Sequence, residues 1–239
     1  MDNKKVAERY DLIKFISNPE LNLRVTSIID SETPDFIVET LDNKISIELT
    51  RLTNPDLKKV EEFRNKIIKK AEILFREKYN ADLRCLITFQ NVELKGGTQQ
   101  IEKYSYDIFS LIENIYSVNK DFDFDITLKE GKHLNNFISR LHINNKLGFN
   151  NWQHFGAYKV DRISLDWLKN KILLKEESIK KYKKQSDENW LLLISNFWGK
   201  SSTHDFDFLT SQDINTLSNT AFDKVFVYLL MENRTIKIK

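Results

Sequence analysis

The most informative segment of the sequence is PDFIVETLDNKISIELT, residues 34–50. Two runs rich in β-branched and aromatic residues flank Asp42 and Asn43, a pair that tolerates the backbone conformation of a tight turn. The sequence therefore predicts a β-hairpin whose strands span residues 36–41 and 44–49.

A turn at this centre also predicts which residues lie opposite one another. Phe36 pairs with Leu49, and the residues that share their face of the hairpin are largely apolar. The other face carries Asp35 and Glu48 as diagonal neighbours, with Cβ atoms at most about 7–8 Å apart. Two carboxylates at this separation can both turn toward one divalent cation. Mg²⁺ prefers oxygen ligands and is often held by one or two carboxylates.

Apolar periodicity predicts helices and strands on both sides of the hairpin. The N-terminal helix is expected from Val6, Tyr10 and Ile13, which recur at helical spacing. The elements predicted around the hairpin are a helix over 6–16, a strand over 23–29, a helix over 54–79 and a strand over 83–89. Residues 1–95 are thus expected to form an αβββαβ core.

Residues 96–239 are expected to be an α/β extension that packs on this core and completes a single α/β domain, 1–239. Its predicted elements are a helix over 98–118, short strands and turns over 121–160, a lysine-rich helix over 163–184, and strands over 190–197 and 225–230. The lysines of the predicted helix over 163–184 suit either a face that contacts the phosphates of nucleic acid or the solvated side of an amphipathic helix.

The composition excludes several classes of protein. With 239 residues and 41% hydrophobic residues, the chain is long enough for one substantial core, and a net charge of +2 neither demands nor forbids nucleic acid. The single cysteine, Cys85, excludes a disulfide framework within the chain and a cysteine-cluster zinc site. No apolar stretch approaches the roughly 20 residues of a membrane span, and the N-terminus lacks a secretory signal. We expect a soluble, cytoplasmic protein with no membrane partner.

The element order αβββαβ, with Pro34-Asp35 opening the second strand and Glu48-Leu49 near the end of the third, resembles the PD-(D/E)XK nuclease superfamily. The resemblance implies a restriction-endonuclease-like fold with a mixed central sheet flanked by helices. It implies hydrolysis of phosphodiester bonds in nucleic acid, with DNA the expected substrate and Mg²⁺ or Mn²⁺ the cofactor. Asp35, Glu48 and the main-chain carbonyl of Leu49 are the implied metal ligands. Glu8 is the implied auxiliary acid on the first helix.

The sequence departs from the family motif at one position. Thr50 stands where the family usually has a lysine that orients the attacking water, and threonine can bind a water but supplies no positive charge. Members of the family tolerate replacement at this position, in some cases with a basic group that arrives from a neighbouring helix. Lys58, Lys59, Lys171 and Lys175 are the candidates for that role and for contacts with nucleic acid. The alternative is a catalytically inactive module of the same fold that binds nucleic acid or a protein partner.

Overall fold

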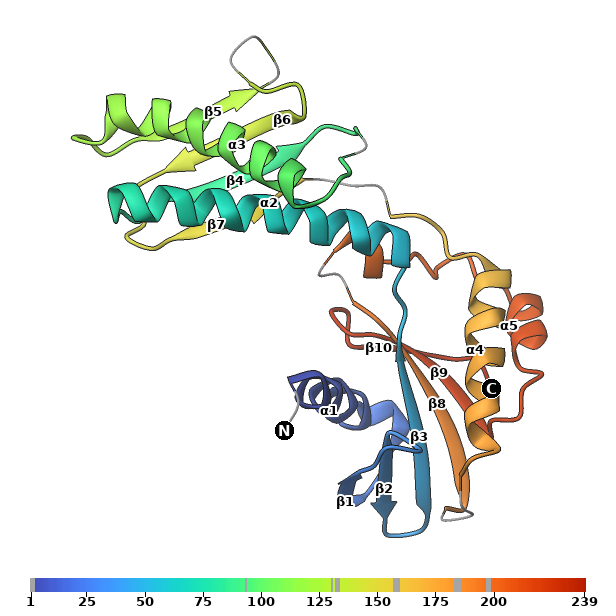
Figure 1. Cartoon of the computed structure of the whole chain (residues 1–239). Coiled ribbons are helices and arrows are strands. Elements are labelled where there is room, and N and C mark those ends of the chain that lie inside the picture. The colour runs from blue at the N-terminus through green and yellow to red at the C-terminus, as the bar shows by residue number, and fades with distance from the viewer. Residues whose placement is uncertain are drawn as a thin grey trace. The chain divides into compact units, whose positions relative to one another are not determined.

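The computed structural model describes residues 3–92, 94–129, 131, 134–156, 160–182, 186–196 and 199–239. The chain divides into two compact units, residues 1–54 with 160–239 and residues 55–159 (Figure 1). The expected boundary between core and extension, at residue 95, lies inside the second unit. Each unit is built around its own β-sheet. None of the helices in the described ranges is long and apolar enough to cross a bilayer.

The first unit contains a six-stranded sheet in the order β1-β2-β3-β8-β9-β10. Neighbouring strands are antiparallel from β1 to β3, parallel from β3 through β8 to β9, and antiparallel again between β9 and β10. The elements are α1 (Asn3–Ile16), β1 (Val25–Asp30), β2 (Phe36–Thr40), β3 (Lys44–Arg51), α4 (Leu165–Ile179), β8 (Glu188–Ser195), α5 (Ser211–Leu217), β9 (Lys224–Leu229) and β10 (Arg234–Lys237), with short 3-10 turns at Pro19–Leu21 and Lys200–Ser202.

Helices cover both faces of this sheet. Leu12 and Phe15 of α1 pack on one face, in the core cluster that contains Phe36 and Ile47 of the hairpin. Helices α4 and α5 contribute to a second core cluster on the other face. The central strand β8 is buried on both sides, as its apolar run Trp190–Ile194 predicts. The unit is therefore a three-layer α/β structure with a mixed sheet.

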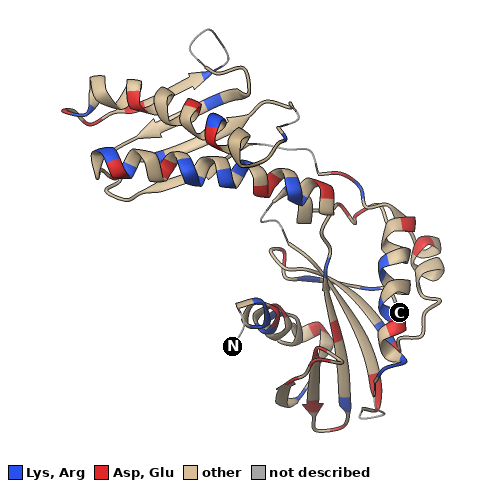
Figure 2. Ribbon diagram, viewed as in Figure 1, with Lys and Arg blue, Asp and Glu red and all other residues tan. Residues whose placement is uncertain are grey.

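The second unit is a four-stranded sheet in the order β5-β6-β4-β7, packed against two long helices. Its elements are α2 (Pro55–Tyr79), β4 (Arg84–Phe89), α3 (Thr98–Asn119), β5 (Asp125–Lys129), β6 (Ile138–Asn144) and β7 (Asn151–His154). Charged residues of both signs recur along α2 (Figure 2), and its apolar side, with Ile67, Ala71 and Phe75, is buried against the sheet.

The position of β4 shows that the predicted αβββαβ core over residues 1–95 is wrong in its last strand. We predicted that residues 83–89 join the sheet of the hairpin, but β4 pairs with β6 and β7 in the second sheet. An apolar run predicts that a strand is buried and says nothing of which strands it pairs with. The strand that lies parallel to β3 is β8, which follows α4. The order helix, three strands, helix, strand is thus made by α1, β1, β2, β3, α4 and β8, with residues 55–159 inserted between β3 and α4.

The hairpin register also differs from the prediction, by two residues. Phe36 lies opposite Ile47 and not Leu49, and Glu39 lies opposite Lys44. The connection is therefore a four-residue loop. It is closed by Thr40, whose N–H donates to the Asn43 carbonyl and whose hydroxyl accepts the Asn43 N–H, both at 2.9 Å. Because side chains alternate with period two, a shift of two leaves the predicted faces intact.

The first helix forms where predicted, but its buried side differs from the expected stripe. Val6, Tyr10 and Ile13 are 49%, 56% and 43% exposed, whereas Glu8 and Asp11 are buried. The acids are tolerated because each has a cationic partner, described below. The predicted end of the lysine-rich helix, with Lys183 and Lys184, and the predicted end of the next strand at Phe197 lie outside the described residues.

Candidate functional site

The two acids of the motif lie on neighbouring strands at the open end of the hairpin. Continuing the observed register by one residue from Phe36 and Ile47 brings Asp35 directly opposite Glu48. This is closer than the diagonal position that the sequence predicted, because directly opposite Cβ atoms are about 4.5–5.5 Å apart. The Asp35 carboxylate accepts the main-chain N–H of Leu49 at 2.8 Å, which fixes it against β3.

Glu48 is bound by two residues from the far end of the chain. Its Oε1 forms an ion pair with Lys175 of α4 at 2.8 Å, and its Oε2 accepts the hydroxyl of Tyr182 at 2.7 Å. Glu48 is only 7% exposed, so these contacts satisfy a carboxylate that burial would otherwise penalise. Burial, followed by the hydrogen bond to Glu48, raises the pKa of Tyr182 far above its usual range. Tyr182 is therefore a neutral donor.

Asp35 is half-buried, and its charge is disfavoured by its surroundings. Burial raises its pKa, and the nearby negative charge of Glu48 raises it further; the Leu49 N–H and the charges of Lys175 and Lys5 act in the opposite direction. The ammonium of Lys5 donates to the main-chain carbonyls of Asp35 and Ser31, at 2.7 and 2.8 Å. The balance leaves Asp35 in a site where additional positive charge is favourable.

Two further oxygen atoms of β3, the Leu49 carbonyl and the Thr50 hydroxyl, belong to the candidate site. The N–H and C=O of one strand residue point to the same side, so the Leu49 carbonyl lies on the side of β3 that faces Asp35. The Thr50 hydroxyl is buried and has no hydrogen-bond partner among the residues described in the structure. A buried hydroxyl in this state gains from binding a water molecule.

The structure brings one of the candidate lysines into contact with the acids. Lys175 reaches Glu48. Lys171, one turn earlier on α4, lies over the ring of Trp167, 5.1 Å from its centroid. Lys58 and Lys59 lie on α2 in the second unit, in ion pairs with Glu62 and Asp56.

Glu8, the expected auxiliary acid, lies on α1 and forms an ion pair with Lys4 at 3.4 Å. Its neighbour Asp11 binds Arg51, and the charge of Glu8 contributes to a raised Asp11 pKa whose main cause is burial. Arg51 belongs to the α1 face of β3, because it alternates with Thr50 and Glu48, which point to the α4 face. Glu8 is thus grouped with Asp11 and not with Asp35 and Glu48.

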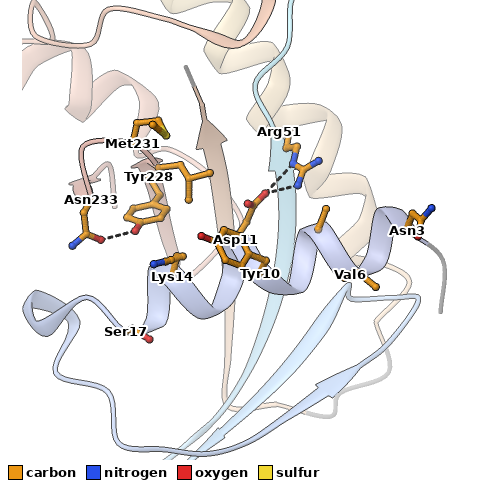
Figure 3. A pocket seen from close by; sticks show the side chains of 12 residues that line it. Asn3, Val6, Tyr10, Asp11, Lys14, Ser17, Arg51, Tyr228, Met231 and Asn233 are labelled. Atoms are coloured by element: carbon orange, nitrogen blue, oxygen red, sulfur yellow. Dashed lines mark hydrogen bonds and ion pairs between the residues drawn. The ribbon is translucent and has the colours of Figure 1, made fainter. Parts of the chain in front are cut away.

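A pocket of about 920 Å³ lies beside this second group of charges (Figure 3). It is lined by residues of α1, among them Tyr10 and Lys14, by Arg51, and by the turn that follows β9, where the Tyr228 hydroxyl donates to Asn233 at 2.6 Å. The Val6 and Tyr10 side chains that are exposed on α1 open onto this pocket.

Tyr182 was not predicted as a site residue. The signal was present: Tyr182 follows Lys175 by about two helical turns, so both lie on one face of an extended helix. The helix α4 ends at Ile179, but the chain continues in a turn in which the Tyr182 N–H donates to the Ile179 carbonyl at 3.0 Å. This turn keeps Tyr182 on the side of Lys175.

The residues fit the divalent ion that the family resemblance implies. Asp35, Glu48 and the Leu49 carbonyl offer hard oxygen donors, as Mg²⁺ prefers. Burial, and after it the charge of Glu48, raises the pKa of Asp35, so a cation is favourable beside it. Within the described ranges no group of three or more His, Cys, Asp or Glu side chains could hold a metal. A Mg²⁺ ion commonly has only one or two protein carboxylates and completes its shell with water and substrate. Two carboxylates and a carbonyl are therefore a sufficient set.

Comparison of the chain with protein-family models, with curated proteins and with solved structures found no match in any of the three. Its function must therefore be argued from the site itself.

Proposed function

We propose that this protein is a metal-dependent nuclease that hydrolyses phosphodiester bonds, with DNA as its substrate. The observation that carries the proposal is the convergence of Asp35, Glu48 and Lys175 at the open end of the β2–β3 hairpin, with Lys175 bound to Glu48 at 2.8 Å. Two acids and one ammonium group form the charge arrangement that the family resemblance requires, and here the ammonium comes from a helix instead of position 50.

Each residue of the site has a role in this chemistry. Asp35, Glu48 and the Leu49 carbonyl would hold the divalent ion, which when bound would supply positive charge that stabilises the phosphate. Lys175 takes the role of the missing motif lysine, orienting the attacking water and offsetting phosphate charge. The Thr50 hydroxyl, which has no partner within the described ranges, donates a hydrogen bond to the same water or accepts one from it. Tyr182 holds the Glu48 carboxylate in place.

The test is cleavage of end-labelled single- and double-stranded DNA and RNA with Mg²⁺ or Mn²⁺ and with a chelator. We expect metal-dependent cleavage by the wild type and a loss of about a thousandfold in Glu48→Gln, since a bound metal contributes several kcal/mol to transition-state stabilisation. The matched control is Glu177→Gln, which removes the same charge from an exposed ion pair with Lys180 on α4. Equal activity in Glu48→Gln and the control would refute the proposal.

One observation favours the alternative, a binding module without catalytic activity. Both oxygens of Glu48 already have partners, Lys175 and Tyr182, so the carboxylate is satisfied without a metal. This alternative predicts that the wild type cleaves none of the substrates and that nucleic-acid binding, where present, survives Glu48→Gln.

A further inference from the structure

The sheet of the second unit has two different faces. On one, Cys85 and Ile87 of β4 and Ile143 of β6 pack against α2 and α3. Because side chains alternate along a strand, Arg84 and Thr88 of β4 point to the opposite face. The two described helices of this unit both contribute to the core cluster on the first face, so the side chains of the opposite face are the outward ones.

The strand registers align these outward side chains in rows across the sheet. Lys129 of β5 lies opposite Arg140 of β6, and Arg140 lies opposite Thr88 of β4. Phe155, just after β7, continues the pairing of that strand with β4, since its N–H donates to the Ile87 carbonyl at 2.9 Å and its carbonyl accepts the Thr88 hydroxyl. One row therefore carries two cations, a hydroxyl and an aromatic ring.

Among the described residues of this face, positive charge predominates. Lys129 and Arg140 are exposed and directly opposite each other, an arrangement that is unfavourable unless an anion lies nearby. Arg84 adds a third cation on β4. The acid of the same face, Asp125, is bound to His142 at 2.7 Å.

An exposed ring and a shallow hollow lie beside these cations. The Phe155 side chain is 53% exposed, although it follows directly on a paired strand. Together with Thr88 and Arg140 it lines a depression of about 140 Å³ on the outward face. Cations along a sheet with an exposed aromatic ring form the combination that binds single-stranded nucleic acid: phosphates contact the cations, and a base stacks on the ring.

We propose that the outward face of the β5-β6-β4-β7 sheet binds single-stranded nucleic acid, with phosphates on Lys129, Arg140 and Arg84 and a base stacked on Phe155. The choice of this partner rests on the proposed function, for which the face would supply the grip on a substrate strand. The binding itself uses neither the metal nor the Asp35–Glu48 site, so it is measurable whether or not the chain cleaves.

The experiment measures fluorescence anisotropy of a labelled 20-nucleotide single-stranded DNA of mixed sequence, titrated with the full-length Glu48→Gln protein in chelator over a range of salt. Lys129→Gln/Arg140→Gln in this background should weaken binding at least tenfold at low salt. It should also reduce the salt slope by about 1.4, two contacts at about 0.7 each for a single strand. Phe155→Ala should weaken binding about tenfold and leave the salt slope unchanged, because stacking releases no counterions.

The matched control is Lys66→Gln/Lys103→Gln, which removes the same charge from exposed positions on α2 and α3. Thermal melting confirms that each variant is folded. The proposal is overturned if the Lys129/Arg140 variant binds as the control does, or if a duplex of equal length binds more tightly than the single strand. It is also overturned if polyglutamate competes as well as DNA, which would identify a surface for acidic protein partners. Failure of the nuclease proposal, by contrast, would leave these affinities unchanged.

Discussion

Two clusters of charged side chains lie on opposite faces of β3, and their charge balance differs. On the α1 face each acid has a cation of its own. The Asp11 carboxylate accepts hydrogen bonds from the Nε and one Nη of Arg51, at 2.8 and 2.7 Å, and Glu8 forms an ion pair with Lys4. On the α4 face Asp35 and Glu48 act on each other, and Lys175 bonds to only one of them.

This difference in charge balance indicates which of the two clusters is suited to catalysis. An acid with a dedicated cation is neutralised and stabilises the packing of α1 on the sheet. On the α4 face one ion pair, Glu48–Lys175, serves two acids, and Lys5 bonds there only to main-chain carbonyls. Burial and the charge of Glu48 raise the pKa of Asp35, so the positive charge of a divalent cation is favourable at this site. We therefore propose a structural role for the Asp11–Arg51 cluster and place the proposed catalytic role on the Asp35–Glu48–Lys175 cluster.

Between the cations of the two faces, the larger effect on cleavage is expected from the cation of the α4 face. Lys175→Met should lower the rate of metal-dependent cleavage about a hundredfold, because a residue that activates or positions the attacking water typically contributes 10²–10⁴. Lys175→Arg, which retains the charge, should recover part of the rate. The measurement is single-turnover cleavage at saturating metal. Lys171→Met is the control on the same helix, and an equal loss there would show that Lys175 acts only through the general charge of α4.

The cation of the α1 face should affect stability instead. Arg51→Met should lower the free energy of unfolding by about 2 kcal/mol. This is less than the roughly 3–5 kcal/mol of a fully buried pair, because the Arg51 side chain is 36% exposed while Asp11 is 4% exposed. Urea denaturation measures the loss, and Asp11→Asn/Arg51→Met should restore part of it. If cleavage at low temperature falls as far as in Lys175→Met, the division between the two faces is wrong.

Tyr182 tests the cluster on the α4 face through its hydrogen bond to Glu48. Tyr182→Phe removes one hydrogen bond to a carboxylate and should cost about 1.5 kcal/mol in stability, with at most about a tenfold loss in cleavage. Since burial and Glu48 hold the Tyr182 pKa high, the effect should not change between pH 6 and pH 9. A pH-dependent effect in that range would indicate that the phenol ionises in the reaction.

The smallest effect concerns the stability cost of the Asp35 charge. Its pKa in the folded chain is raised above the ordinary 3.8, so folding favours the protonated form and stability falls as the pH rises through that raised value. Asp35→Asn should therefore melt at a higher temperature than the wild type at pH 7, and the difference should vanish below about pH 3.8. Melting curves from pH 3 to 8 measure it. A variant less stable than the wild type at pH 7 would contradict the assigned charge balance.

The sequence predicts the hairpin and its two faces because alternation of side chains survives a register error. It does not predict the register, since the Thr40 hydroxyl closes a four-residue loop that competes with the two-residue turn. It predicts that Asp35 and Glu48 lie together on neighbouring strands, because they are close in sequence. It does not choose Lys175 from four lysines, because the contact with Glu48 depends on the pairing of β3 with β8, and the pattern of residues 83–89 suggested a different neighbour.

The most direct test of a metal site at Asp35 and Glu48 is a titration of the full-length protein with Mn²⁺, monitored by electron paramagnetic resonance. The titration compares the wild type with Asp35→Asn, Glu48→Gln and Arg51→Met. The account predicts one saturable Mn²⁺ in the wild type and in Arg51→Met, and loss of that ion in both acid variants. A wild type that binds no Mn²⁺, or a Mn²⁺ ion that is retained in Asp35→Asn and in Glu48→Gln, would contradict the proposed metal site.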